Sequence, residues 1–179
     1  MRRCMHSDGR RRKVLDSSFV CVAKPVSSAS LEGWNGVAMV LNGEIAKGLS
    51  HLNVLVGTFG HVGGADLGRM MLAEIYTTLL LGGRRPPFLV LVRNLAAVVS
   101  ARLKASRETE RLLNVALKNP HFSEQGVFRA RIELQFGRLY RARNQPALSR
   151  THLERAYTIA SAQNAPRMLE RINGELGRL

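Results

Sequence analysis

Apolar residues spaced three and four positions apart run from about residue 31 to the end of the chain. Segments with this helical spacing alternate with short stretches of Gly, Pro or Asn. The pattern predicts helices over 32–41, 44–56, 66–81, 86–101, 106–119, 123–143, 147–162 and 166–179. The apolar run at 88–101 is too long for a typical strand, and no segment alternates apolar and polar residues as a half-buried strand does. The sequence therefore predicts an all-α fold.

Cap and turn residues set the expected ends of these helices. The four glycines at 57, 60, 63 and 64 predict a flexible connection, and Asp66 is typical of the N-cap of the helix that follows. Gly82 and Gly83 are expected to end that helix, and Pro86 with Pro87 to open the next. We expect Ser123 to cap a later helix.

A spacing of small and large residues recurs along the chain. In the clearest unit, over 130–161, the positions 3, 7, 12, 16 and 19 residues after Gly137 are Tyr140, Asn144, Ser149, Leu153 and Ala156. The same steps from Gly36 reach Met39, Gly43, Gly48, Leu52 and Leu55. A first-helix half recurs at 72–76 and a second-helix half at Leu113 and Ala116, with an extra helix expected between them over 88–101.

This spacing resembles the tetratricopeptide (TPR) motif, in which small residues let two antiparallel helices approach closely while large residues fill the space beside them. The resemblance implies antiparallel helical hairpins stacked as a right-handed array over residues 31–179. Three positions depart from the motif: Glu133 in place of an aromatic residue, Ser149 in place of Ala, and Ser161 in place of Pro.

The segments 72–76, 86–95 and 131–156, with Ala165-Pro166 and Arg171-Ile172, resemble one family in particular. They are similar to the C-terminal TPR-like region of large bacterial class III adenylate/guanylate cyclases that also carry an AAA-type ATPase module. In that family the catalytic domain lies far toward the N-terminus. The resemblance therefore implies a regulatory piece of a larger cyclase/ATPase polypeptide, whose other domains would be partners, and it does not make this chain a cyclase.

Positive charge is the main feature of the composition. The 179 residues carry a net charge of +14, and 22 of the 27 basic residues are arginines. Such an excess favours acidic partners, which include nucleic acid, an acidic protein surface and an anionic membrane, and a compositional bias toward Arg is the alternative explanation. Few aromatic residues are present for base stacking, and no zinc finger or RNA-recognition signature is found.

The first 30 residues lack helical periodicity, and we expect them to form a basic, poorly ordered leader. A signal-peptide core over 14–26 and an organelle transit peptide are the alternatives, but Asp16 and Lys24 interrupt the apolar run. Cys4 and Cys21 show no disulfide or zinc-site pattern, which fits a reducing cytosol. No apolar stretch reaches the ~18 residues that a membrane span needs.

Catalytic and cofactor motifs are missing from the sequence. The glycine-rich stretch 57–64 contains no Lys for a phosphate loop, and its spacing does not fit a dinucleotide fingerprint. Five scattered histidines at 6, 51, 61, 121 and 152 are expected on the surface or in turns, and no metal-ligand pair or nucleophile elbow is present. We expect no enzyme activity, no cofactor and no metal.

The candidate binding residues lie on two of the predicted helices. Steps of seven and three place Arg131, Arg138 and Arg141 on one face of a helix. By the TPR resemblance, this face and Leu134 would line a groove that holds an acidic peptide or a carboxylate. A solvated helix face is the alternative. Glu74, in an apolar helix, would meet a cationic ligand in the groove or pair with a nearby Arg.

Two functions remain open from the sequence. The leading hypothesis is a non-catalytic helical-repeat scaffold for protein–protein interaction or regulation. The alternative is a basic helical protein that binds nucleic acid, for which counterion release predicts a steep loss of affinity as salt rises.

Overall fold

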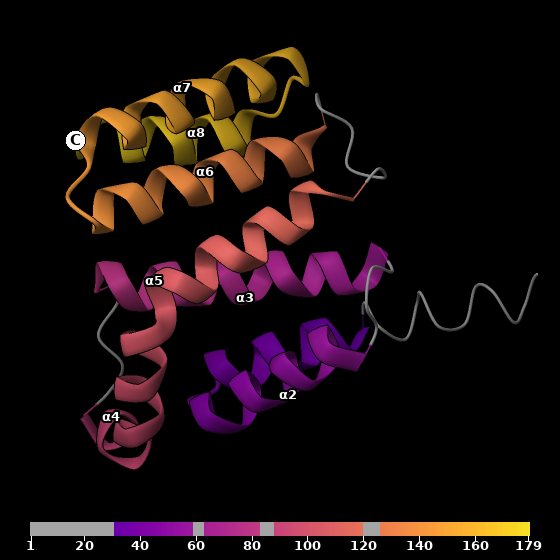
Figure 1. Ribbon diagram of the computed structural model, residues 1–179, viewed down its shortest axis with the longest axis vertical. Coiled ribbons are helices and arrows are strands. Elements are labelled where there is room, and N and C mark those ends of the chain that lie inside the picture. Colours follow the sequence, from indigo (N-terminus) through magenta and orange to yellow (C-terminus); the bar gives the residue numbers. More distant parts are fainter. Residues whose placement is uncertain (1–30, 59–62, 83–87, 120–125) are drawn as a thin grey trace, which may run out of the picture.

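The computed structural model describes residues 31–58, 63–82, 88–119 and 126–179 (Figure 1). These residues form helices and turns and contain no strand, which confirms the all-α prediction. The expected leader at 1–30, Pro86-Pro87 and the Ser123 cap lie outside the described residues.

Eight helical segments follow one another along the described chain. The first covers residues 31–41. The others are α2 (Ile45–Thr58), α3 (Gly63–Leu81), α4 (Phe88–Arg93), α5 (Leu95–Leu117), α6 (Val127–Ala142), α7 (Pro146–Ala162) and α8 (Pro166–Leu176). Pro146 and Pro166 open α7 and α8, where a missing N–H costs nothing.

Short turns with a left-handed residue separate several of these helices. The backbone φ angle is +86° at Gly43, 57° at Asn144 and 49° at Asn164. Asn tolerates this conformation better than most residues that carry a Cβ, and Gly adopts it without strain. The sequence placed such turns at Gly43 and Asn144, and the structure has them there.

Three local predictions are wrong. Gly57 and Gly63 lie inside α2 and α3 rather than in a connection. Asp66 lies within the first turn of α3 and is fully buried, where it accepts hydrogen bonds from Arg69 and Asn119 instead of capping the helix.

The third error concerns the two helices expected over 86–101 and 106–119. The helix is interrupted at Asn94, after the short α4. α5 then continues without interruption through residues 102–105, where the sequence predicted a break between two helices. The Asn94 side chain explains the break, because its amide donates to Gly43 O at 2.9 Å and accepts from Ala46 N at 3.2 Å. A tertiary contact therefore fixes this helix end.

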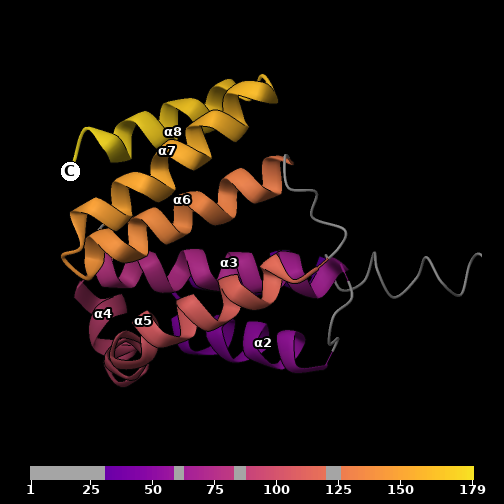
Figure 2. The same cartoon turned by 45° about the horizontal axis from the view of Figure 1, so that its top comes forward.

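Two apolar clusters make up the core of the described residues. The larger one joins α2, α3, α5 and α6 through side chains that include Leu52, Tyr76 and Leu112. The smaller one joins α6, α7 and α8 through residues that include Leu153 and Ile172. Figures 1 and 2 show α5 crossing over α3, with α6, α7 and α8 beyond them.

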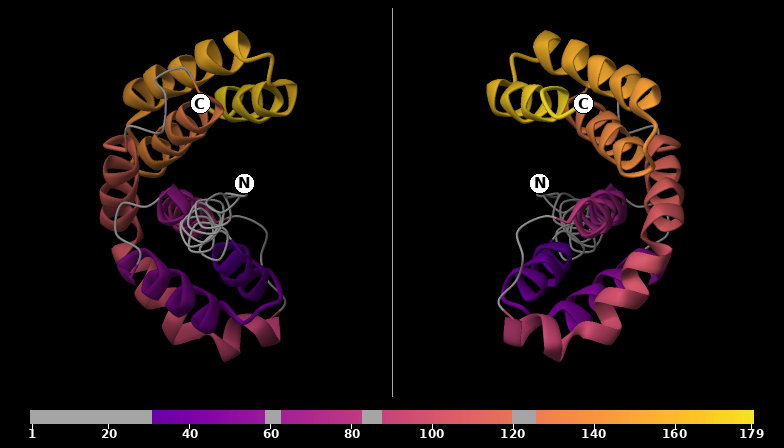
Figure 3. Two further views of the ribbon diagram at one scale, coloured as in Figure 1. Left: turned by 90° about the vertical axis from the view of Figure 1, so that its right-hand side faces the viewer. Right: turned by 90° about the vertical axis from the view of Figure 1, so that its left-hand side faces the viewer.

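The helices form a crescent when viewed as in Figure 3. α5 and α7 lie on its outer side, and α3, α6 and α8 lie on its inner side together with the helix over residues 31–41. We call the surface presented by these four helices the inner face.

Candidate functional site on the inner face

The sequence-predicted site residues lie on the inner face but are paired with one another and with α8. Arg131 of α6 donates to Glu74 of α3 at 2.6 Å. Arg138 and Arg141 contact Glu175 of α8 at 3.4 Å and 2.6 Å. Leu134 is 1% exposed, so it lies beneath the inner face and is not available at its surface. The arginines of α6 therefore face α3 and α8 and not open solvent.

Glu74 joins three helices through two arginines. Its Oε2 accepts from Arg131, and its Oε1 accepts from Arg171 of α8 at 2.6 Å. Burial alone would raise the pKa of Glu74, but the hydrogen bonds and charges of Arg131 and Arg171 outweigh it and leave the pKa below its ordinary value. Of the two sequence interpretations of Glu74, pairing with a nearby Arg is the one that the structure shows.

Glu175 is the second point at which charges meet. Arg178 donates to its Oε1 at 3.2 Å, on the side opposite Arg141. Burial lowers the pKa of the Arg138 guanidinium, and the charge of Glu175 opposes that effect. Two buried donors here, Arg131 Nε and Gln135 Nε2, have no hydrogen-bond partner among the described residues, whereas Arg138 Nε and Arg141 Nη1 lie against the Glu175 carboxylate.

Two cavities divide the inner face into a polar and an apolar half. The polar cavity, of about 480 Å³, is lined by Leu134, Arg138, Glu170, Arg171, Gly174, Glu175 and Arg178. The apolar cavity, of about 340 Å³, lies between the helix over 31–41 and α3 and is lined by residues that include Trp34, Leu41, Ile75 and Leu79. Glu74 and Arg131 line the apolar cavity and thus stand where the two halves meet.

The residues that form the ion pairs of the inner face and line its polar cavity carry a small positive charge. Five arginines at 131, 138, 141, 171 and 178 and three glutamates at 74, 170 and 175 give this group a charge of +2. Arg171 and Arg178 are the most open of the cations that the structure pairs here, with side chains 46% and 66% exposed. A ligand that approaches the face therefore meets these two arginines first.

Sequence reasoning missed the contribution of α8 to this face. Arg171, Glu175 and Arg178 follow at steps of four and three, which is the same signal that singled out the arginines of α6. Trp34, Val37 and Leu41 follow at steps of three and four on the first helix. Both groups were detectable from spacing, but only the fold shows that they share a surface.

Two glutamate–histidine pairs were also missed. Glu133 lies 2.7 Å from His152 Nδ1, and Glu32 lies 2.8 Å from His51 Nε2. Each Glu comes four residues before the glycine of its unit, and each His three residues after the small residue of the second helix. His152 also stacks on Phe136 and Tyr140, with ring centroids 5.1 Å apart in each case. These histidines are packed between helices rather than scattered.

Comparison of the chain with family models, with curated proteins and with solved structures finds no match. Within the described ranges, no three side chains of His, Cys, Asp or Glu come together as metal ligands would. In the same ranges, none of the helices has the length and apolar character needed to cross a membrane.

Proposed function

We propose that this chain is a TPR-like helical-repeat module that has no catalytic chemistry and binds a segment of a protein partner on its inner face. The observation that carries the proposal is one packing arrangement found twice. We call residues 31–58 the N-terminal pair and residues 127–162 the C-terminal pair.

The two pairs have the same register of small and large residues and share one close contact. A Cβ at Gly36 would lie 2.6 Å from Leu52 Cγ, and a Cβ at Gly137 would lie 2.6 Å from Leu153 Cγ. Each leucine follows its glycine by sixteen residues. A residue with positive φ stands seven positions after each glycine, at Gly43 and at Asn144. Close approach at small residues, repeated at a fixed register, supports a stacked array of antiparallel hairpins.

The inner face supports partner binding because it combines shape with two kinds of chemistry. Exposed apolar side chains at Trp34 and Leu41 suit a bulky apolar residue of the partner. Arg171 and Arg178 suit an acidic residue or a terminal carboxylate, with the α6 arginines behind them. A partner segment that carries both kinds of group is the ligand we propose.

Charge reversal at the rim of the polar cavity tests this proposal. Reversing Arg131 or Arg138 would place a new carboxylate against Glu74 or Glu175 and would confuse loss of binding with loss of folding. Arg171 and Arg178 also contact Glu74 and Glu175, but their side chains are 46% and 66% exposed, so a new carboxylate at either position can turn into solvent. The better variant is therefore Arg171→Glu with Arg178→Glu, and the matched control is Arg150→Glu with Arg155→Glu on exposed positions of α7. The probe is a fluorescent dodecapeptide that contains one Trp and four Glu, followed by anisotropy.

We expect the α8 variant to bind the peptide at least about tenfold more weakly than the wild type, and the α7 control to change affinity less than about twofold. Circular dichroism should show equal helicity in all three proteins. Equal losses in the two variants, or no binding by the wild type, would contradict the assignment of the inner face.

We further propose that the module regulates a larger polypeptide in the cytosol. The support is the resemblance of segments 72–76, 86–95 and 131–156 to the C-terminal region of class III cyclases with an AAA-type ATPase module, together with the unpatterned Cys4 and Cys21. The neighbouring reading frame tests this: a cyclase or ATPase domain upstream supports the proposal, and an unrelated upstream gene argues against it.

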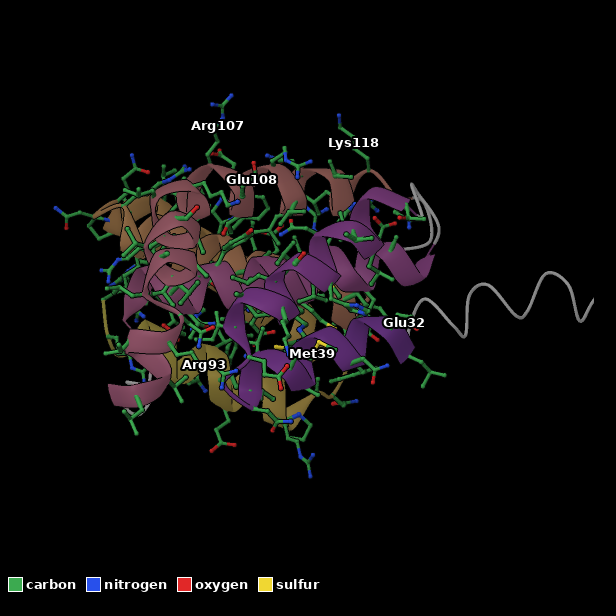
Figure 4. The ribbon with its side chains drawn as sticks, turned by 90° about the horizontal axis from the view of Figure 1, so that it is seen from below. Glu32, Met39, Arg93, Arg107, Glu108 and Lys118 are labelled. Atoms are coloured by element: carbon green, nitrogen blue, oxygen red, sulfur yellow. The ribbon has the colours of Figure 1, made fainter. Side chains whose placement is uncertain are left out.

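Binding of nucleic acid is a second candidate, favoured by cations on the outer side of α5. Arg107 and Lys118 are exposed and point away from the helical body (Figure 4). Neither makes an ion pair with another described residue. A filter-binding titration over salt decides the matter, because phosphate contacts predict a steep loss of affinity as salt rises. Absence of retention at low salt would reject this candidate.

A further inference from the structure

A row of exposed apolar side chains runs along the outer side of α4 and the first half of α5. Leu89, Val92, Val99 and Leu103 are 80%, 55%, 49% and 84% exposed, and Ala96 between them is also exposed. We call these five residues the outer row. It lies at the edge of the molecule, away from α7 and α8 (Figure 1), and it shares no residue with the cavities of the inner face.

The opposite side of these helices is packed, which fixes the outward direction of the row. Asn94 is held to Gly43 and Ala46 by its side-chain hydrogen bonds, and Val90 contacts Gly43. Ala101 and Ala105 are buried in the core beneath α5. The packing of the opposite side therefore fixes the orientation of α4 and α5 and leaves the outer row facing solvent.

The spacing of the row is that of a coiled-coil seam. Its members follow one another at steps of three, four, three and four residues. Helical bonding continues across the break, because Asn94 N donates to Val90 O and Asn94 O accepts from Val98 N. From Leu89 to Leu103 the row covers two heptad steps, across the end of α4 and the start of α5. A narrow seam of this kind fits one partner helix.

Cations border the row on both sides, and no anion does. Arg93 and Lys104 lie along one side, and Arg102 lies along the other, all of them exposed. Residues 88–107 contain no Asp or Glu. None of these three cations makes an ion pair within the described part of the chain. Pairing with a second copy of this chain would bring like charges together beside the seam, so a self-interaction is disfavoured.

We propose that the outer row is a docking surface for an amphipathic helix of another protein, with apolar residues at its seam and Glu or Asp beside them. Leu89, Val99 and Leu103 bury themselves against the partner's apolar residues, and Arg93, Arg102 and Lys104 meet its carboxylates. This surface is separate from the inner face, so it does not depend on the function proposed above.

A designed acidic peptide tests the surface on the full chain. The probe is a fluorescent peptide of four heptads with Leu at the seam positions a and d and Glu at the flanking positions e and g, which repels itself and stays monomeric alone. Its partner probe carries Lys in place of Glu. We expect the chain to bind the Glu peptide at least about tenfold more tightly than the Lys peptide.

Two pairs of exposed substitutions separate the apolar and the ionic contributions. Val99→Ser with Leu103→Ser should weaken binding of the Glu peptide at least about tenfold, whereas the same change at exposed positions elsewhere, Val127→Ser with Leu148→Ser, should leave it within about twofold. Arg102→Glu with Lys104→Glu should reverse the preference toward the Lys peptide. All six positions are exposed, so folding is preserved.

Four results would overturn the proposal. These are equal binding of both peptides, no loss with the serine pair at 99 and 103, and a dimer in sedimentation that this serine pair abolishes. The fourth is binding of phosphatidylserine vesicles that depends on Val99 and Leu103 while the Glu peptide does not bind, which would assign the row to a membrane surface.

Discussion

The helices of the N-terminal pair cross at two glycines, whereas those of the C-terminal pair cross at a glycine and a serine. A Cβ at Gly48 would lie 2.7 Å from the carbonyl oxygen of Gly36 and 2.9 Å from the backbone nitrogen of Val40. At the matching position, Ser149 fits with its side chain and donates a hydrogen bond to Gly137 O at 2.7 Å. The first crossing is closed by backbone contact, and the second by a polar side chain.

The glutamate–histidine pairs also differ, since the one in the C-terminal pair is more buried and has more polar contacts. Glu133 is 2% exposed and also contacts Arg129, whereas the Glu32 side chain is 47% exposed and has His51 beside it. The same spacing of small and charged positions is therefore compatible with two different ways of packing a pair of helices. The N-terminal pair depends on shape at its crossing, and the C-terminal pair adds buried polar contacts to it.

The largest difference between the pairs should appear when alanine replaces the second small residue. Gly48→Ala forces a methyl group against two backbone atoms that cannot rotate away, and we expect a loss of about 2 kcal/mol or more in the free energy of unfolding. Urea denaturation measures it. Gly174→Ala in the exposed part of α8 is the control, since a Cβ there meets nothing within 4 Å and should gain up to about 1 kcal/mol.

A smaller loss is expected at the first glycine of the C-terminal pair. A Cβ at Gly137 would meet two side-chain atoms of Leu153, which can shift, and only one backbone atom, Ser149 O, at 3.3 Å. We expect Gly137→Ala to cost about 1 kcal/mol in the same denaturation experiment. A cost above that of Gly48→Ala would show that the two crossings were ranked wrongly.

Removal of the hydroxyl at the second crossing should cost less again. Ser149→Ala keeps the Cβ, for which space exists, and deletes the hydrogen bond to Gly137 O. The expected loss is up to about 1 kcal/mol, because a buried neutral hydrogen bond contributes about that much. An unchanged denaturation midpoint would mean that the hydroxyl does not distinguish the C-terminal pair.

The smallest effect concerns pH. Burial would raise the pKa of Glu133, but the hydrogen bond from His152 and the charge of Arg129 lower it below its ordinary value. The stability that this carboxylate contributes is thus present above the pKa of the unfolded chain and is lost as pH falls through the lower folded pKa. Glu133→Gln should lose less stability than the wild type between pH 6 and pH 3. Glu32→Gln should follow the wild type, because an exposed ion pair contributes little.

How far the sequence predicted these features depended on whether the cause was local. The residues that turn the chain, Gly43 and Asn144, and the close approach of Gly137 to Leu153 followed from spacing alone. The break at Asn94 did not, since its cause is a pair of hydrogen bonds to residues 48 and 51 positions away.

The inner face shows the same limit. Helical spacing placed Arg131, Arg138 and Arg141 on one face, but their partners lie on other helices. Glu74 is 57 residues from Arg131 and 97 residues from Arg171, and no local sequence pattern predicts either ion pair. The charge of the face was therefore overestimated from α6 alone, and its apolar half was not foreseen.

Double-mutant cycles test most directly whether each pair of helices meets at its two small residues. We would measure unfolding free energies for Gly36→Ala and Gly48→Ala, for Gly137→Ala and Ser149→Val, and for the corresponding double variants. We expect a coupling energy of more than about 0.5 kcal/mol within each pair, and additive effects for Gly48→Ala combined with Gly137→Ala. Additive effects within both pairs would contradict the account, because the residues would then not share a crossing.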